Sequence, residues 1–214
     1  MDTLRKYWKK RKKLATTTQR WLTGGIPTEN CLAAYEPSLA ANLAASYINL
    51  HKPGTNDATI ATIAPGLGAA GWILSGTEAL ETALAIGTGN SAIAKCTFAG
   101  GVGTLFGASG GGHTFGVLYD GSGGTLYLIY DGISGDIPGN PTPACIALTP
   151  TGGYVDAVKV KAIAAPGAPT PTLWIGALNN GAGGQWFYSG TISSLYVYDI
   201  DVAAFVPGLY AVMP

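Results

Sequence analysis

The sequence has few charged residues and few of the side chains that most catalytic sites use. Charged residues make up 11% of the chain, and its two histidines are His51 and His113. Glutamate occurs at four positions, and no Glu-x-Asp-x-Glu alternation places a pair of carboxylates on one face of a strand, as glycoside hydrolysis requires. No Gly-x-Ser-x-Gly motif accompanies either histidine. We therefore expect that the chain is not an enzyme.

Cysteines and long apolar runs are also scarce. Cys31, Cys96 and Cys145 show no metal-ligand spacing and no CxxC pair, so we expect three free thiols, which is typical of a reducing cytosol. No segment has the ~20 apolar residues that a membrane span needs. The basic start is not followed by the ~7–15-residue apolar core of a signal peptide, and we expect none.

Glycine and proline, in contrast, are abundant. The chain holds 32 Gly and 13 Pro, which disfavour a helical bundle, while an apolar content of 47% argues against disorder. Glycine-rich turns separate short apolar runs at a spacing typical of one large all-β sandwich. Strands are expected near residues 91–99, 102–108, 112–119, 124–130, 143–148, 154–163, 171–178, 185–189 and 191–199.

The net charge of zero hides a strong asymmetry. Residues 1–20 carry eight Lys or Arg against one acid, a charge of +7, while the rest of the chain carries −7. We predict that residues 1–30 form a basic helical arm and hinge, and residues 31–214 a body. Such an arm favours docking on an acidic surface, and nucleic acid is a weaker candidate because no recognition fold accompanies it. The predicted docking residues are Arg5, Lys6, Tyr7, Trp8, Lys9, Lys10, Arg11, Lys12, Lys13 and Trp21.

Three segments carry a family resemblance. Residues 173–178 (LWIGAL), 187–199 (FYSGTISSLYVYD) and 72–80 (WILSGTEAL) resemble the strands of laminin-G-like (concanavalin A-like) jelly rolls. The resemblance implies an antiparallel β-sandwich that ends in a short C-terminal helix near residues 202–213. Pro207 and Gly208 are expected to interrupt that helix.

The resemblance also suggests two kinds of site. Domains of this type often hold calcium at the rim of the sandwich, which implies Asp120, Asp131 and Asp136 as ligands. The alternative is that these residues only form tight turns, in which Asp is common without any metal. No other cofactor is implied. A glycan site needs exposed aromatic rings, and Trp186 and Tyr188 are the candidates, because Trp72 and Trp174 lie in strands expected to build the core.

Small proteins with a short arm and one such domain resemble accessory structural proteins of tailed bacteriophages. This resemblance implies a virion surface protein made in the host cytoplasm, either a capsid decoration protein or a tail or fibre subunit. Its partners would be other virion proteins, further copies of itself and host or environmental glycans. The alternative is a cellular carbohydrate-binding or adhesion module with Trp186 and Tyr188 in its sugar site.

Overall fold

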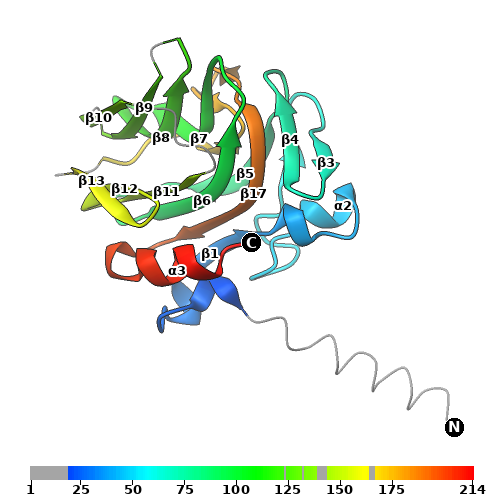
Figure 1. Ribbon diagram of the computed structural model, residues 1–214, viewed down its shortest axis with the longest axis horizontal. Coiled ribbons are helices and arrows are strands. Elements are labelled where there is room, and N and C mark those ends of the chain that lie inside the picture. The colour runs from blue at the N-terminus through cyan, green and yellow to red at the C-terminus, as the bar shows by residue number, and fades with distance from the viewer. Residues whose placement is uncertain (1–18, 123, 132, 139–143, 164–166) are drawn as a thin grey trace, which may run out of the picture.

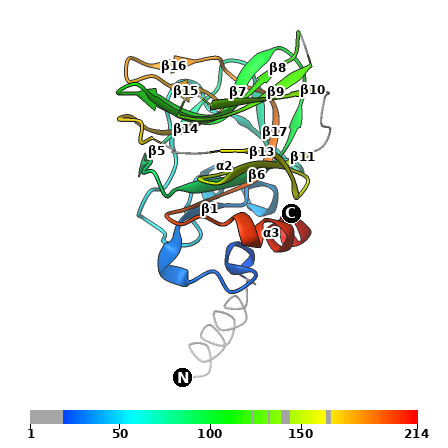
Figure 2. The same ribbon diagram turned by 90° about the vertical axis from the view of Figure 1, so that its left-hand side faces the viewer.

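Two antiparallel sheets packed face to face form the body of the protein (Figures 1 and 2). The structure is a computed structural model that describes residues 19–122, 124–131, 133–138 (backbone alone), 144–163 and 167–214. The predicted β-sandwich is confirmed. The arm residues Arg5 to Lys13 lie outside the described residues.

Sheet A has β17 at its centre. In spatial order it contains β13 (Val158–Ala162), β12 (Gly152–Val155), β11 (Ala144–Thr149), β6 (Ser91–Phe98), β17 (Ser189–Tyr198), β4 (Gly71–Ser75) and β3 (Gly66–Gly68), and β1 (Cys31–Tyr35) also pairs with β17. Beside β6, the first half of β17 pairs with β4 and the second half with β1. β17, the last strand of the body, therefore pairs with β1, its first strand.

Sheet B lies above sheet A in Figure 2. Its order is β10 (Ile133–Pro138), β9 (Thr125–Tyr130), β8 (His113–Asp120), β7 (Val102–Gly110), β14 (Thr172–Ile175), β5 (Leu80–Ala85) and β2 (Thr59–Ile60). A small hairpin of β15 (Leu178–Asn179) and β16 (Gly184–Gln185) is attached to β7. The helical segments are η1 (Arg20–Leu22), η2 (Thr28–Asn30), η3 (Pro37–Leu39), α2 (Leu43–Ser46), η4 (Ala203–Phe205) and α3 (Val206–Val212).

The main core fills the space between the sheets. Trp72 is fully buried, and its indole Nε1 donates to the Ser46 hydroxyl at 2.7 Å, which holds α2 against β4. Gly190 shows why β17 needs a glycine, because its φ is +149° and a Cβ there would lie 2.0 Å from the Thr97 carbonyl oxygen. Close packing of β17 on β6 thus depends on that missing side chain.

A second apolar cluster covers the outer face of sheet A. Tyr196 and Tyr198 on β17 point away from the main core and pack against Trp21 and α3. Trp21 is 2% exposed, lies 6.3 Å from the Tyr196 ring and accepts a 2.7 Å hydrogen bond from the Tyr198 hydroxyl on its carbonyl oxygen. The prediction that Trp21 belongs to the docking arm is therefore wrong, because this ring is part of the folded body.

The C-terminal helix forms where it was expected, but proline does not interrupt it. Pro207 lies in the first turn of α3, where no hydrogen-bond donor is needed and the fixed φ of proline suits the helix. Val206 and Leu209 from this helix are buried against sheet A. Within the described part of the chain, no helix is both long enough and apolar enough to cross a membrane.

Replacing Trp21 with alanine tests the second cluster. We expect Trp21→Ala to lower the free energy of unfolding by about 3–5 kcal/mol, because it empties a buried aromatic site. Trp186→Ala is the matched control and should change it by less than about 1 kcal/mol, since half of that side chain is exposed. Urea denaturation measures both, and equal effects would contradict the assignment of Trp21 to the core.

Candidate functional site

The β15–β16 hairpin presents one large aromatic side chain to solvent. Trp186 follows β16 and is 50% exposed, as the sequence predicted. Its backbone has a φ of +50°, a conformation that bulky residues rarely adopt. The Trp186 carbonyl oxygen accepts a 2.6 Å hydrogen bond from the Thr104 N–H, which fixes the residue to the edge of β7. The exposed indole is therefore held on a rigid element.

Beside Trp186, a row of side chains crosses the outer face of sheet B. The register places Phe187, Thr104, Leu118 and Tyr127 next to one another on adjacent strands. Neighbouring strands lie about 4.8 Å apart, so the row from Phe187 to Tyr127 spans roughly 14 Å. Phe187, Leu118 and Tyr127 are half-buried. We call the surface formed by Val102, Leu118, Asp120, Tyr127, Trp186 and Phe187 the open face.

The hairpin leans on the outer side of sheet B through small and apolar residues (Figure 2). A Cβ at Gly107 would lie 2.6 Å from the Leu178 side chain, and one at Gly184 would lie 2.7 Å from the Trp174 ring. Trp174 is 9% exposed, which confirms its expected place in a packed cluster. These contacts set the position of the hairpin and hence of Trp186.

Tyr188 does not belong to the open face. The ring is 1% exposed and packs edge-on against Phe98, while its hydroxyl donates to the Thr97 carbonyl oxygen at 2.5 Å. The prediction that Tyr188 contacts a glycan is therefore wrong. After the left-handed backbone at Trp186, Phe187 packs in the cluster of Trp174, and Tyr188 packs in the main core.

The three predicted calcium ligands do not come together. Asp120 ends β8, whereas the Asp131 N–H bonds to Thr114 near the start of the same strand, so the two lie roughly 20 Å apart. Asp120 accepts from the Ser122 N–H and hydroxyl, and Asp131 bonds to His113 Nδ1. The backbone of Asp136 lies opposite Tyr127. This placement corrects the prediction of one shared calcium site, and the described residues hold no cluster of three or more His, Cys, Asp or Glu.

The cysteines do not supply a nucleophile. Cys31, Cys96 and Cys145 are free and buried, as expected from their spacing. Burial raises the pKa of both Cys31 and Cys145 to about 12, so their thiols stay protonated near neutral pH.

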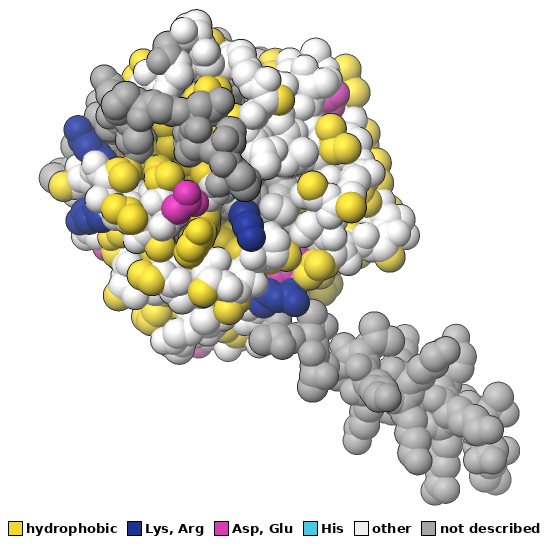
Figure 3. All heavy atoms as spheres, in the orientation of Figure 1, with side chains coloured by type: hydrophobic (Ala, Val, Ile, Leu, Met, Phe, Trp, Pro, Cys, Tyr) yellow, Lys and Arg dark blue, Asp and Glu magenta, His cyan; other side chains and the backbone are white. Residues whose placement is uncertain are grey.

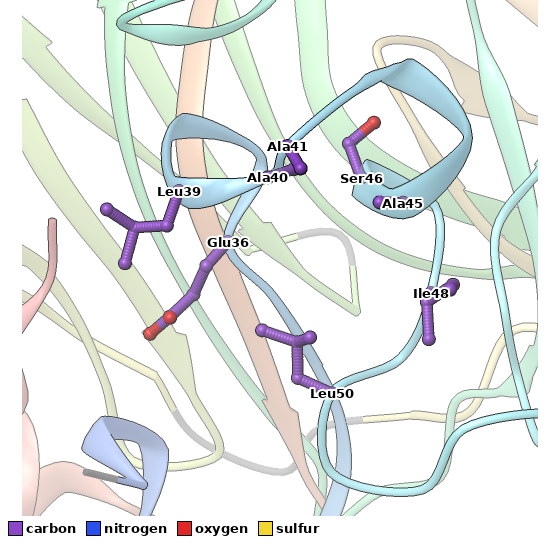
Figure 4. Close-up of a pocket in the computed structure, with 8 residues that line it drawn as sticks. All are labelled: Glu36, Leu39, Ala40, Ala41, Ala45, Ser46, Ile48 and Leu50. Carbon is purple, nitrogen blue, oxygen red and sulfur yellow. The ribbon is translucent and has the colours of Figure 1, made fainter. Parts of the chain in front are cut away.

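A hollow of about 250 Å³ lies between η3, α2 and the segment that follows α2 (Figure 4). Figure 4 shows Glu36, Leu39 and Leu50 on one side of it and Ala45, Ser46 and Ile48 on the other. Both carboxylate oxygens of Glu36 have partners, since the Tyr196 hydroxyl donates at 2.6 Å and Arg20 at 3.1 Å. The hollow is therefore lined mainly by apolar side chains, with its one carboxylate already engaged.

A second hollow of about 550 Å³ lies where η2 meets the loop after Leu50. It is lined by Thr28, Glu29, Cys31, Leu32, His51, Lys52, Thr55 and Asn56. Among the described residues, His51 Nδ1 is buried without a hydrogen-bond partner. Burial and then the nearby Lys52 lower the pKa of His51, which favours the neutral imidazole. Neither hollow could be predicted from the sequence, because their lining comes mainly from loops and short helical turns without a motif.

The comparisons with known proteins show the fold. No protein-family model matches the sequence, and no curated protein does. Domain 4 of an extracellular GH43 arabinanase from Geobacillus stearothermophilus, solved in complex with arabinotriose, superposes with a TM-score of 0.60 at 17% identity, over 85% of this chain and 98% of that domain. The sialidase of Trypanosoma rangeli, solved in complex with sialic acid, superposes with a TM-score of 0.59 at 15% identity, over 86% of this chain. This chain spans about one third of the sialidase.

These likenesses correct the prediction that the chain is not an enzyme. That prediction rested on the lack of paired carboxylates in the sequence. The same fold nevertheless occurs within a sialidase and a GH43 arabinanase, which are both glycoside hydrolases. At 15–17% identity, the likeness establishes the fold alone. The fold itself therefore gives no reason to exclude carbohydrate chemistry.

Removing the Glu36 carboxylate should destabilise the protein. We expect Glu36→Ala to lower the free energy of unfolding by about 3 kcal/mol, because it leaves the buried Tyr196 hydroxyl and the Arg20 guanidinium unpaired. Glu36→Gln keeps an acceptor for Tyr196 and should cost less. Urea denaturation of both variants measures this, and an unchanged stability of Glu36→Ala would contradict a structural role for the carboxylate.

Proposed function

We propose that this protein is an oligosaccharide-binding β-sandwich module whose binding surface is the open face. The observation that carries the proposal is Trp186, an exposed indole held in a strained backbone conformation at the edge of a rigid sheet. Strain of this kind persists only where the surrounding structure enforces it, and it concentrates at functional sites. A fixed indole offers a flat apolar surface on which the C–H face of a sugar ring stacks with little loss of conformational entropy.

The remainder of the open face suits an extended ligand. Tyr127 and Phe187 present aromatic surface at the two ends of a row of roughly 14 Å, and Leu118 lies between them. Asp120 and the exposed Gln185 offer polar groups at the rim for sugar hydroxyls. The ligands named for the two similar structures are both sugars, which supports the same class of ligand here.

Trp186→Ala tests the proposal directly. We expect it to weaken binding to oligosaccharides at least tenfold, because truncating a stacked tryptophan removes the main contact area. Affinity is measured by calorimetry, starting with arabinotriose and other neutral oligosaccharides identified on a glycan array. Reducing-sugar release from the same mixtures reports any hydrolysis.

Tyr210→Ala provides the matched control for this substitution. Tyr210 is an aromatic residue of α3, far from the open face, and is 40% exposed. Its loss should leave the affinity unchanged. The proposal fails if no oligosaccharide binds, or if Trp186→Ala and Tyr210→Ala bind with the affinity of the unmodified chain.

A second proposal concerns the basic arm. We propose that it attaches the module to an acidic surface of a larger particle, and that the particle is a virion. The support is the charge of +7 on residues 1–20, together with Tyr7 and Trp8, which are typical of interface anchors. The body, with its charge of −7, would then remain outside.

Neutralising four lysines of the arm tests this attachment. Replacing Lys9, Lys10, Lys12 and Lys13 with glutamine should strongly reduce co-sedimentation with a particle in a density gradient of a native lysate, because the charge of residues 1–20 falls from +7 to +3. Replacement of the same four residues with arginine preserves the charge and should preserve co-sedimentation. Migration of the unmodified chain as a free monomer would contradict the particle assignment, with no consequence for glycan binding.

A further inference from the structure

We infer that the open face selects neutral oligosaccharides and rejects those that carry sialic or uronic acids. The inference rests on the proposed function and adds the charge class of its ligand. Recognition of a carboxylate needs a cation or an array of N–H donors at the site, because a desolvated anion without one is strongly unfavourable.

Sheet B contains no lysine or arginine, and its histidine, His113, pairs with Asp131 at the end of β8 remote from Asp120. None of its strands, β2, β5, β7 to β10 and β14 to β16, includes a lysine or an arginine, and the sequence has neither residue between positions 96 and 158. On the face of the molecule seen in Figure 1, the space-filling view shows a few separate Lys and Arg side chains among apolar and neutral ones (Figure 3). A carboxylate on the open face would therefore find no lysine or arginine on its own sheet.

The cations of the described body are positioned on the other layer. Lys95 lies on β6 of sheet A and donates to the Met213 carbonyl oxygen at 3.0 Å. Lys159 and Lys161 lie on β13, at the edge of sheet A. Arg20 is paired with Glu36, and Lys52 lines the hollow beside η2. None of these residues belongs to the surface around Trp186.

The acidic residues of sheet B add negative charge to it. Asp120 lies opposite Val102 on the open face, and Thr104, two residues along the same strand as Val102, bonds to Trp186. Glu81 on β5 is exposed and lies opposite Trp174 in the register. Their field would repel an anionic ligand, whereas their oxygens accept hydrogen bonds from sugar hydroxyls. The surface thus favours a polyhydroxylated ligand without charge.

Pairs of oligosaccharides that differ by one acidic group test the inference. Suitable pairs are lactose with sialyllactose and a xylo-oligosaccharide with its glucuronic-acid-substituted form. The full chain is used with Lys9, Lys10, Arg11, Lys12 and Lys13 replaced by glutamine, so that the basic arm does not attract anions by itself. We expect the neutral member of a bound pair to bind at least tenfold more tightly in 50 mM salt, and its affinity to stay constant as the salt rises to 500 mM.

Asp120→Asn separates the charge effect from shape. The substitution keeps an acceptor for the Ser122 N–H and removes the negative charge, so the preference for the neutral member should fall at least threefold at 50 mM salt. Asp199→Asn is the control and should leave the preference unchanged, because Asp199 directly follows β17 of sheet A and bonds to Asn30. Tighter binding of the acidic member, lost in Trp186→Ala, would overturn this inference and leave the proposed function intact. Binding of no member at all would overturn both.

Discussion

Tyr196 and Tyr198 lie on the outer face of sheet A, where η1 and α3 cover them. Both phenols are buried, and their hydroxyls are satisfied by the Glu36 carboxylate and the Trp21 carbonyl oxygen. Burial raises the pKa of each phenol, so both remain hydrogen-bond donors. The N-terminal η1 and the C-terminal α3 thus cover the outer face of sheet A around β17. Among the described residues, no helix covers sheet B in this way, and Leu118, Tyr127 and Phe187 on its outer face are half-buried beside the small β15–β16 hairpin.

Short apolar runs between glycine-rich turns predicted the sandwich together with the family resemblance, and strands such as β5 and β9 show an apolar alternation of their own. β6, β7, β8, β9 and β11 begin and end within two residues of the expected limits. The patterns failed where burial depends on distant segments. The second half of β17 is buried on both faces, since η1 and α3 pack on it, and no alternation within the strand indicates that cover. For the same reason, the sequence could not show that Trp21 belongs to the core.

The candidate site was predictable in part. The glycine-rich turn before Trp186 indicated an exposed loop, and the indole is exposed there. The buried Tyr188 comes two residues after the left-handed backbone at Trp186, whose carbonyl oxygen bonds to the Thr104 N–H. Such a backbone is rare for tryptophan and has no signature in the sequence. Asp120 and Asp131 suited calcium by residue type, but their separation follows from the length of β8, which brings one to each end of the strand.

The central claim is that a neutral oligosaccharide binds to the open face beside Trp186. Nuclear magnetic resonance of the chain labelled with ¹⁵N in its five tryptophans resolves each indole N–H, and substitution assigns the signal of Trp186. The chain is titrated with a neutral oligosaccharide already known to bind it. We expect a saturable shift of the Trp186 signal, while the signals of the buried Trp72 and Trp21 do not change. Saturable binding that shifts Trp21 and leaves Trp186 unmoved would place the ligand on the opposite layer and contradict the account.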